Sequence, residues 1–191
     1  KTYIYVAETV ISVGVETDDM KKSVPMIASG STHTVVLKPN GTVWTWGQDT
    51  YGQLGDNDSE TKAYAVEVVK EGNIILDNVK EVAAGTAHSL ALTKDGYVYA
   101  WGNNSNGQLG NGDTSSTNEK FHDNDTTDGI YAAQKVYRGE SAATNDDWYI
   151  QDVIDIAAGK SFSVALKADG TVWTWGLNTV SYTHLRAHET R

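Results

Sequence analysis

GTVWTWG occurs twice in this chain, at Gly41–Gly47 and at Gly170–Gly176, and a looser copy, GYVYAWG, lies between them at Gly96–Gly102. A ligand-stacking platform needs its tryptophans at one place, whereas a structural repeat needs the same residues in every copy. Three copies in register are typical of a chain built from stacked structural units. The heptapeptide therefore predicts a repeat architecture.

Each heptapeptide ends a longer unit, and the three units align without gaps at Val24–Gly47, Val79–Gly102 and Val153–Gly176. Two units continue into a second block, YGQLGDND from Tyr51 and NGQLGNGD from Asn106. The third unit stops matching before such a block. We therefore expect two full repeat units and a truncated third.

The repeats occupy residues 24–179, and we assign residues 1–23 to strands of a preceding blade or domain. The last residues, 180–191, differ in composition, because they hold two histidines and two arginines in a row of twelve. Their order, VSYTHLRAHETR, resembles a translated transposase adapter from a sequencing library. We expect this tail to be an artefact that takes no part in the fold.

Paired turn residues separate two apolar runs in every unit, at Asn40-Gly41, Asp95-Gly96 and Asp169-Gly170. Such pairs accept the positive φ angles of a type I′ turn, so each predicts a β-hairpin. The flanking runs, such as SLALT and YVYAW, are apolar on both alternating faces, which is typical of strands covered on both sides. This pattern favours an all-β fold, a partial β-propeller of antiparallel four-stranded blades, over a linear β-solenoid.

The order GxxHSLALxxDGxVYAWGxNxxGQLGxGD, clearest at Gly85–Asp113, resembles the repeat of the regulator of chromosome condensation family. The resemblance covers Val24 to about Thr179 and implies a seven-bladed propeller, in which the remaining blades of the same chain complete the ring. The VWTWG variant and the Asn/Asp/Thr-rich linkers look like prokaryotic members. Those are often parts of large bacterial surface or secreted proteins, so we expect an extracellular or cell-surface location rather than a cytoplasmic one.

Three repeat positions carry residues that we assign to structure, namely the glycines Gly30, Gly85 and Gly159, the tryptophans Trp46, Trp101 and Trp175, and the histidines His33 and His88. Phe162 stands at the histidine position in the third unit. A benzyl group cannot replace a catalytic or metal-binding imidazole, but it can replace a packed ring. We therefore predict packing or hydrogen-bonding roles for these residues.

The charge balance excludes several classes of partner. The chain has a formal charge of −10, from 15 basic and 25 acidic residues, and it contains no basic run. Binding to nucleic acid depends on Lys and Arg that neutralise phosphates, so we expect no nucleic-acid partner. No stretch approaches the roughly 18 apolar residues of a spanning helix, so we also expect no membrane insertion.

Other motifs are weak. Gly159-Lys160-Ser161 lacks the earlier glycine and the strand–loop–helix context of a phosphate-binding loop. The acidic linker Asp123–Gly129 departs from the spacing of an EF-hand, so we favour a solvated loop and leave calcium binding open. Without cysteine, and without a nucleophile–base motif outside the tail, the chain is predicted to be no enzyme and to hold no cofactor or metal.

The preferred function is a non-catalytic scaffold whose loops bind a protein or a surface polymer. The aromatics Trp148 and Tyr149 are the candidate binding residues, while Tyr131–Tyr137 is either an interface or an outer blade strand. One alternative, implied by the resemblance, is guanine-nucleotide exchange on a Ran-type GTPase. Another is carbohydrate or cell-wall binding through exposed rings at Trp44 and Trp173.

Overall fold

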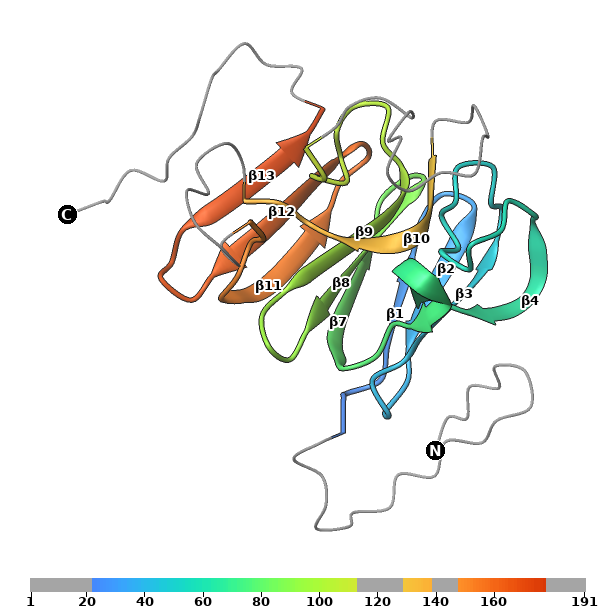
Figure 1. The fold of residues 1–191 in the computed structure, drawn as a ribbon, viewed down its shortest axis with the longest axis horizontal. Helices are drawn as coiled ribbons and strands as arrows, with labels where there is room; N and C mark the ends of the chain where they lie inside the picture. The colour runs from blue at the N-terminus through green and yellow to red at the C-terminus, as the bar shows by residue number, and fades with distance from the viewer. Residues whose placement is uncertain (1–21, 113–128, 139–147, 178–191) are drawn as a thin grey trace, which may run out of the picture.

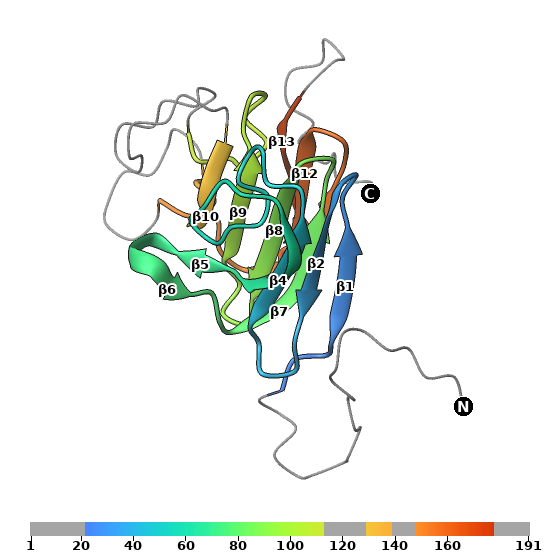
Figure 2. The same ribbon diagram turned by 90° about the vertical axis from the view of Figure 1, so that its right-hand side faces the viewer.

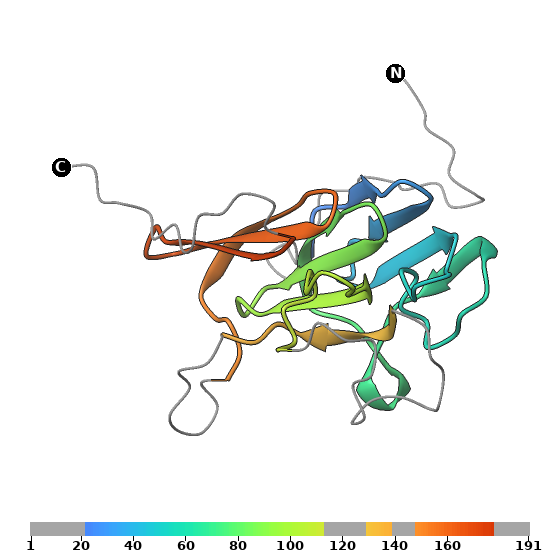
Figure 3. The same ribbon diagram turned by 90° about the horizontal axis from the view of Figure 1, so that it is seen from above.

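The computed structural model of the chain describes residues 22–112, 129–138 and 148–177 (Figure 1). These residues form three β-sheets that stand side by side in chain order (Figures 1 and 3). Among them, no helix combines the length and apolar character that crossing a membrane requires.

The first sheet is a complete four-stranded antiparallel blade in the order of its sequence. Its strands are β1 Met26–Ser29, β2 His33–Leu37, β3 Val43–Gly47 and β4 Lys62–Glu67. The third sheet contains three antiparallel strands, β11 Val153–Ala158, β12 Phe162–Lys167 and β13 Val172–Gly176.

The second sheet holds a four-stranded antiparallel blade and two further short strands, in the order β6-β5-β10-β9-β8-β7. The blade strands are β7 Val79–Ala84, β8 His88–Thr93, β9 Val98–Asn103 and β10 Gly129–Lys135. The added hairpin consists of β5 Val69–Lys70, the 3₁₀ turn η2 Glu71–Asn73 and β6 Ile74–Ile75. The all-β prediction of a partial propeller with antiparallel four-stranded blades is therefore confirmed.

The β5–β6 hairpin was not predicted, and it extends the second sheet beyond four strands (Figure 2). Strand β5 pairs in parallel with the outer strand β10 through Lys70 and Ala133. An outer strand presents unpaired backbone groups, and covering them is a common way to protect a sheet edge. The linker between the first two blades thus covers part of the outer edge of the second.

The hairpins form where they were predicted, but their turn type is different. Gly41, Gly96 and Gly170 have positive φ angles, whereas the preceding Asn or Asp does not. In the first hairpin, the Gly41 amide donates to Lys38 O at 2.9 Å, and Lys38 N donates to Thr42 O at 2.9 Å. This is the three-residue loop of a type I turn followed by a left-handed glycine, which needs only one positive φ. The type I′ prediction was wrong.

Two apolar cores lie between adjacent blades. The core between the first and second blades includes buried residues of both, Val35, Leu37, Val43, Val79, Ala91 and Trp101. The core between the second and third includes Leu90, Leu92, Val98, Val153, Ile156 and Ala165. The blades therefore pack face to face, and β8 of the middle blade is buried along its whole length, as predicted for a strand covered on both faces.

Backbone hydrogen bonds also join the blades at the turns between their first two strands. Ser31 N donates to Thr86 O at 3.1 Å, and Thr86 N donates to Lys160 O at 3.2 Å. The Gly-Lys-Ser triplet of the third unit is therefore one of three equivalent turns in a row. Its backbone joins neighbouring blades.

Candidate functional site

A tryptophan on the third strand of one blade packs against the Gly-Gln-Leu-Gly turn of the preceding blade. Trp101 is fully buried, and its Nε1 donates to Gln53 O at 3.0 Å. A Cβ at Gly55 would lie 2.7 Å from the Trp101 ring, so this glycine permits the close approach. Trp175 lies against Gly110, where a Cβ would be 2.8 Å from its ring, but its buried Nε1 has no hydrogen-bond partner among the described residues.

Trp46 occupies the same repeat position in the first blade and is half-buried. The described residues contain no Gly-Gln-Leu-Gly turn that precedes it in the chain. Trp175 is also half-buried although the preceding blade supplies its turn, so among the three positions full burial is reached at Trp101, in the blade with neighbours on both sides.

A histidine joins each blade to the next. His33 Nε2 lies 2.9 Å from Ser89 Oγ, and Ser89 Oγ donates to Gln53 O at 3.2 Å. Because the serine proton goes to the carbonyl, the imidazole donates from Nε2. Its Nδ1 is buried without a hydrogen-bond partner among the described residues, which suits the lone pair of a neutral ring better than a second N–H. Burial lowers the pKa of His33 to about 4, which agrees with this protonation state.

The same arrangement recurs between the second and third blades. His88 Nε2 lies 3.1 Å from Ser163 Oγ, which donates to Gln108 O at 2.7 Å. Burial, and to a lesser degree His33, lowers the pKa of His88 to about 4. Both histidines thus hold buried hydrogen bonds between blades, and their geometry offers no sign of proton transfer or metal binding.

The repeated glycines make room for these rings. A Cβ on Gly30 would lie 2.2 Å from the His33 ring, and a Cβ on Gly85 would lie 2.1 Å from the His88 ring. A Cβ on Gly159 would lie 2.2 Å from the Phe162 ring. A Cβ on Gly30 would also lie 2.6 Å from Gly85 O, and one on Gly85 would lie 2.6 Å from Gly159 O. The ring and the carbonyl of the next blade therefore both exclude a side chain at these glycines.

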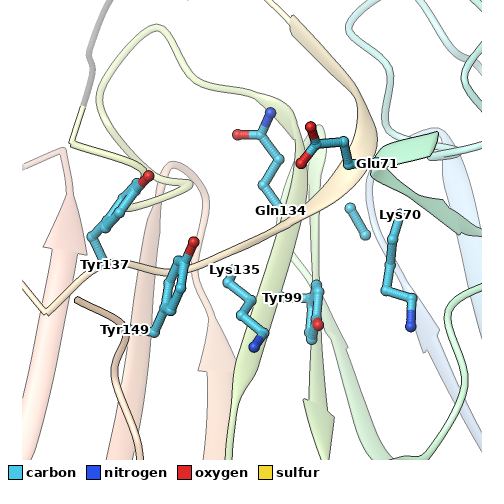
Figure 4. Close-up of a pocket in the computed structure, with 8 residues that line it drawn as sticks. Lys70, Glu71, Tyr99, Gln134, Lys135, Tyr137 and Tyr149 are labelled. Carbon is cyan, nitrogen blue, oxygen red and sulfur yellow. The ribbon is translucent and has the colours of Figure 1, made fainter. Parts of the chain in front are cut away.

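A pocket of about 230 Å³ opens on the outer part of the second sheet (Figure 4). We call it the tyrosine–lysine pocket, and it is lined by Lys70, Glu71, Tyr99, Ala133, Gln134, Lys135, Tyr137 and Tyr149. The residues come from three parts of the chain, namely the β5–η2 segment, β9, and β10 with the segment that follows it. Segments that are far apart in the sequence therefore form the pocket together.

Two stacked tyrosines form one end of the pocket. The rings of Tyr137 and Tyr149 lie side by side with centroids 5.2 Å apart and planes 22° apart (Figure 4). Backbone pairing sets this position, because Arg138 N donates to Trp148 O at 2.8 Å and Ile150 N donates to Val136 O at 3.0 Å. The stack is therefore fixed on a short antiparallel pair of segments.

Lys135 brings a positive charge to the pocket. Its Nζ lies 4.1 Å from the centroid of the Tyr97 ring and 5.1 Å from that of Tyr149. Within the described part of the chain, this ammonium forms no ion pair, whereas Lys70 Nζ lies 3.2 Å from Asp77. Burial raises the pKa of Tyr99 to about 12, so its hydroxyl stays protonated and can donate.

The lining combines aromatic rings with charged and amide groups. It contains no histidine, serine or threonine, and only one carboxylate. Elsewhere among the described ranges, no three acidic, histidine or cysteine side chains gather to hold a metal ion. Aromatic faces, two ammonium groups and an amide can recognise a planar or negatively charged group.

The structure separates the predicted binding residues. Tyr149 lines the pocket, whereas Trp148 is not one of the lining residues and is 53% exposed. Of the two alternatives for residues 131–137, the strand is observed, since β10 pairs with β9 as an outer strand. Sequence reasoning missed Lys70, which reaches the pocket through the unpredicted β5–β6 hairpin. It also missed Tyr99 and Lys135, which are cross-strand partners in β9 and β10.

Several expectations fall outside the described residues. These are the acidic linker except for Gly129, the segment 1–21, and the tail 180–191. The carbohydrate alternative rested on Trp44 and Trp173, which are both half-buried. Trp173 packs against the core between the second and third blades.

A row of antiparallel blades, joined by side chains at repeat positions, defines a β-propeller repeat protein. Models of the regulator of chromosome condensation (RCC1) repeat match residues 27–53, 79–108, 153–181 and, in a second version, 95–122. The chain belongs to the regulator of chromosome condensation repeat family, as the resemblance indicated.

Relatives cover most of this chain but are much longer. The mouse E3 ubiquitin-protein ligase HERC2 is 31% identical over 155 residues, which is 81% of this chain and 3% of the relative. Protein RCC1 of Candida albicans is 29% identical over 158 residues, which is 81% of this chain and 32% of the relative. The chain thus spans less than a third of the relatives it matches.

Solved structures support the same fold. Yeast RCC1 (Prp20), in a crystal structure with Kap60, matches with a TM-score of 0.60 and 24% identity over 79% of this chain and 31% of that one. Human WBSCR16 matches with a TM-score of 0.56 and 26% identity over 80% of this chain and 33% of that one.

Proposed function

We propose that this chain is part of a non-catalytic propeller scaffold that binds a protein partner at the tyrosine–lysine pocket. The observation that carries the proposal is the ammonium of Lys135, which lies over tyrosine rings without a carboxylate partner in the described part of the chain. Aromatic side chains and cations at a shallow pocket are typical anchors of protein interfaces.

The pocket favours a partner segment that combines an acidic and an aromatic side chain. A carboxylate would approach Lys135, which lies in a chain whose net charge is otherwise strongly negative. An aromatic ring would stack on the exposed Tyr137, which is already paired with Tyr149. Aromatic pairs in such arrangements contribute about 0.5–1.5 kcal/mol beyond their buried area.

Solved relatives agree with a protein partner. Yeast RCC1 (Prp20) has been crystallised with Kap60, and the structure of Prp20p has been described together with its binding properties to Gsp1p and histones. Those statements concern the yeast protein, and no residue of its contacts is transferred to this chain. They support the general role of such propellers as platforms for other proteins.

An array of synthetic peptides that vary acidic and aromatic content tests the proposal. We expect peptides with both features to bind, and the variants Lys135→Ala and Tyr149→Ala to weaken binding about fivefold to thirtyfold. The matched control is Lys160→Ala, which removes an exposed lysine on another blade. Equal binding by all four proteins, or binding without preference for acidic peptides, would contradict the proposal.

Guanine-nucleotide exchange is the second candidate, favoured by the similarity to Protein RCC1 of Candida albicans. No exchange motif allows particular residues of this chain to be assigned to that reaction. Release of a fluorescent nucleotide from a Ran-type GTPase measures it directly. Acceleration by the chain that persists in Lys135→Ala would favour this second function over the pocket-based one.

A further inference from the structure

The turn that follows the third strand of a blade is built in the same way in the first and second blades, but with different side chains. Asp49 Oδ1 accepts a hydrogen bond from Leu54 N at 2.7 Å in the first blade. Asn104 Oδ1 accepts from Leu109 N at 3.1 Å in the second. Asp49 and Asn104 therefore occupy equivalent places, with one oxygen committed to the turn.

The second polar atom of the side chain, Asn104 Nδ2 or Asp49 Oδ2, has a partner in the second blade but none among the described residues in the first. In the second blade, Asn104 Nδ2 donates to Asn111 Oδ1 at 3.0 Å. In the first blade, Asp56 stands in the place of Asn111. Asp49 Oδ2 and Asp56 Oδ1 are both buried and lack a hydrogen-bond partner among the described residues. The two orphaned oxygens thus stand where an amide donor and its acceptor meet in the next blade.

We propose that Asp49 and Asp56 bind a single proton between them, so that Asp49 Oδ2–H donates to Asp56 Oδ1 in the same way as the amide of Asn104 donates to Asn111. The proton comes from solvent water and converts one carboxylate of the pair into a carboxylic acid. The paired negative charges become one. The first blade therefore contains a hydrogen bond that depends on pH, where the second blade contains the amide hydrogen bond between Asn104 and Asn111, which does not.

The surrounding charges favour a proton rather than a cation. Within the described part of the chain, Lys62 is the basic group that acts on Asp49, and its Nζ lies 2.7 Å from Asp58 and 3.1 Å from Glu60. Strand β10 packs alongside and contributes Tyr131 and Ala132, of which Ala132 pairs with Asp56. No third metal-ligating side chain joins the pair within the described ranges.

Titration of the pair has a defined sign. Burial, followed by repulsion from Asp56 and Asp58, raises the pKa of Asp49 to about 8, and burial also raises the pKa of Asp56. An unfolded aspartate has a pKa near 4, so the folded chain binds an additional proton between these values. Stability from this proton is complete at acidic pH and is lost as the pH rises through about 8.

Carboxyl carbon NMR of the whole chain measures the proton directly. We expect one aspartate resonance of the wild type to titrate near pH 8 and to vanish in Asp49→Asn. Two aspartates that both titrate below about pH 5 would overturn the proposal. A titration near pH 8 that persists in Asp49→Asn and in Asp56→Asn would also overturn it.

Denaturant unfolding over pH 5 to 9 gives an independent readout. For the wild type, we expect the ratio of folded to unfolded chain to fall by up to about tenfold for each unit by which the pH rises between about 5 and the pKa of Asp49. Asp49→Asn removes this dependence, because its amide donates at every pH. The control Glu71→Gln, which neutralises an exposed carboxylate, should leave the pH dependence of stability unchanged. Equal slopes in Asp49→Asn and the wild type would contradict the proposal.

The reverse exchange tests whether the buried position after the third strand raises the midpoint of any carboxyl pair that occupies it. The double variant Asn104→Asp/Asn111→Asp installs a second carboxyl pair in the second blade. We expect a second aspartate resonance with a raised midpoint, and a steeper loss of stability as the pH rises from about 4 to that midpoint. A double variant whose new carboxyls titrate below about pH 5 would contradict the geometric argument.

Discussion

The middle blade and the two flanking blades are built from the same repeat but are buried to different degrees. All six residues of β8 in the middle blade are buried, whereas burial alternates along β2 of the first blade. His88 is fully buried, while Phe162 at the same position of the third blade is 42% exposed. The comparison shows that a repeat residue contributes most where blades pack on both sides of it.

The largest expected effect comes from the tryptophan joint. Trp101→Ala removes a fully buried indole between the first and second blades, so we expect the free energy of unfolding to fall by about 3–5 kcal/mol. Trp46→Ala removes the half-buried equivalent and should cost less than half as much. Chemical unfolding of both variants checks the difference. Equal losses would show that the neighbouring turn contributes nothing.

The next effect concerns the glycine beside the histidine. In Gly85→Ala the new Cβ would lie 2.1 Å from the His88 ring, and we expect about 1–3 kcal/mol of lost stability from overpacking. Gly170→Ala is the control, because nothing lies within 4 Å and only its positive φ is strained. We expect combination with His88→Ala to relieve the Gly85→Ala penalty. Full additivity of these two changes would contradict the packing explanation.

Acid denaturation tests the buried imidazoles. The pKa values of His33 and His88 are about 4 in the folded chain, below the usual 6.5 of an unfolded histidine. The unfolded chain therefore binds more protons between pH 4 and 6.5, so stability falls as the pH is lowered through this range. We expect up to about tenfold in the folding equilibrium per histidine and pH unit. His88→Phe, which copies the third blade, should remove its share.

The smallest effect on stability comes from the uncovered faces. Ile27 and Ile154 are 64% and 49% exposed on the flanking blades, so replacing each by Thr should change the free energy of unfolding by less than about 0.5 kcal/mol. Exposed apolar sheet faces favour association, and we expect the double variant to reduce it. Sedimentation velocity measures this. Association that is unchanged in the double variant would exclude these faces as its cause.

Much of the fold was predictable from the sequence because each repeat unit carries the same turn residues and the same apolar runs. The hairpins follow from glycines after Asn or Asp, and the coverage of both faces follows from apolar runs such as SLALT. The turn type was not predictable from the Asn-Gly pair alone. The loop is one residue longer than that pair suggests, since Lys38 pairs with Thr42.

The candidate site was only partly predictable. Tyr149 was selected as an aromatic in a polar linker, but several of its partners in the pocket, Lys70, Glu71 and Lys135, lie outside the aligned repeat units. Lys70 reaches the pocket through a parallel pairing with Ala133, which local sequence patterns do not encode. The Asp49–Asp56 pair was visible only after alignment with Asn104 and Asn111 in the structure.

The most direct test of the account is a double-mutant cycle across the first blade joint. His33 and Ser89 lie on different blades and meet at 2.9 Å, so their coupling reports on the joint itself. With His33→Ala, Ser89→Ala and the double variant, we predict a coupling energy of about 1–2 kcal/mol in denaturant unfolding. A coupling energy within about 0.3 kcal/mol of zero would contradict the claim that these repeat residues join neighbouring blades.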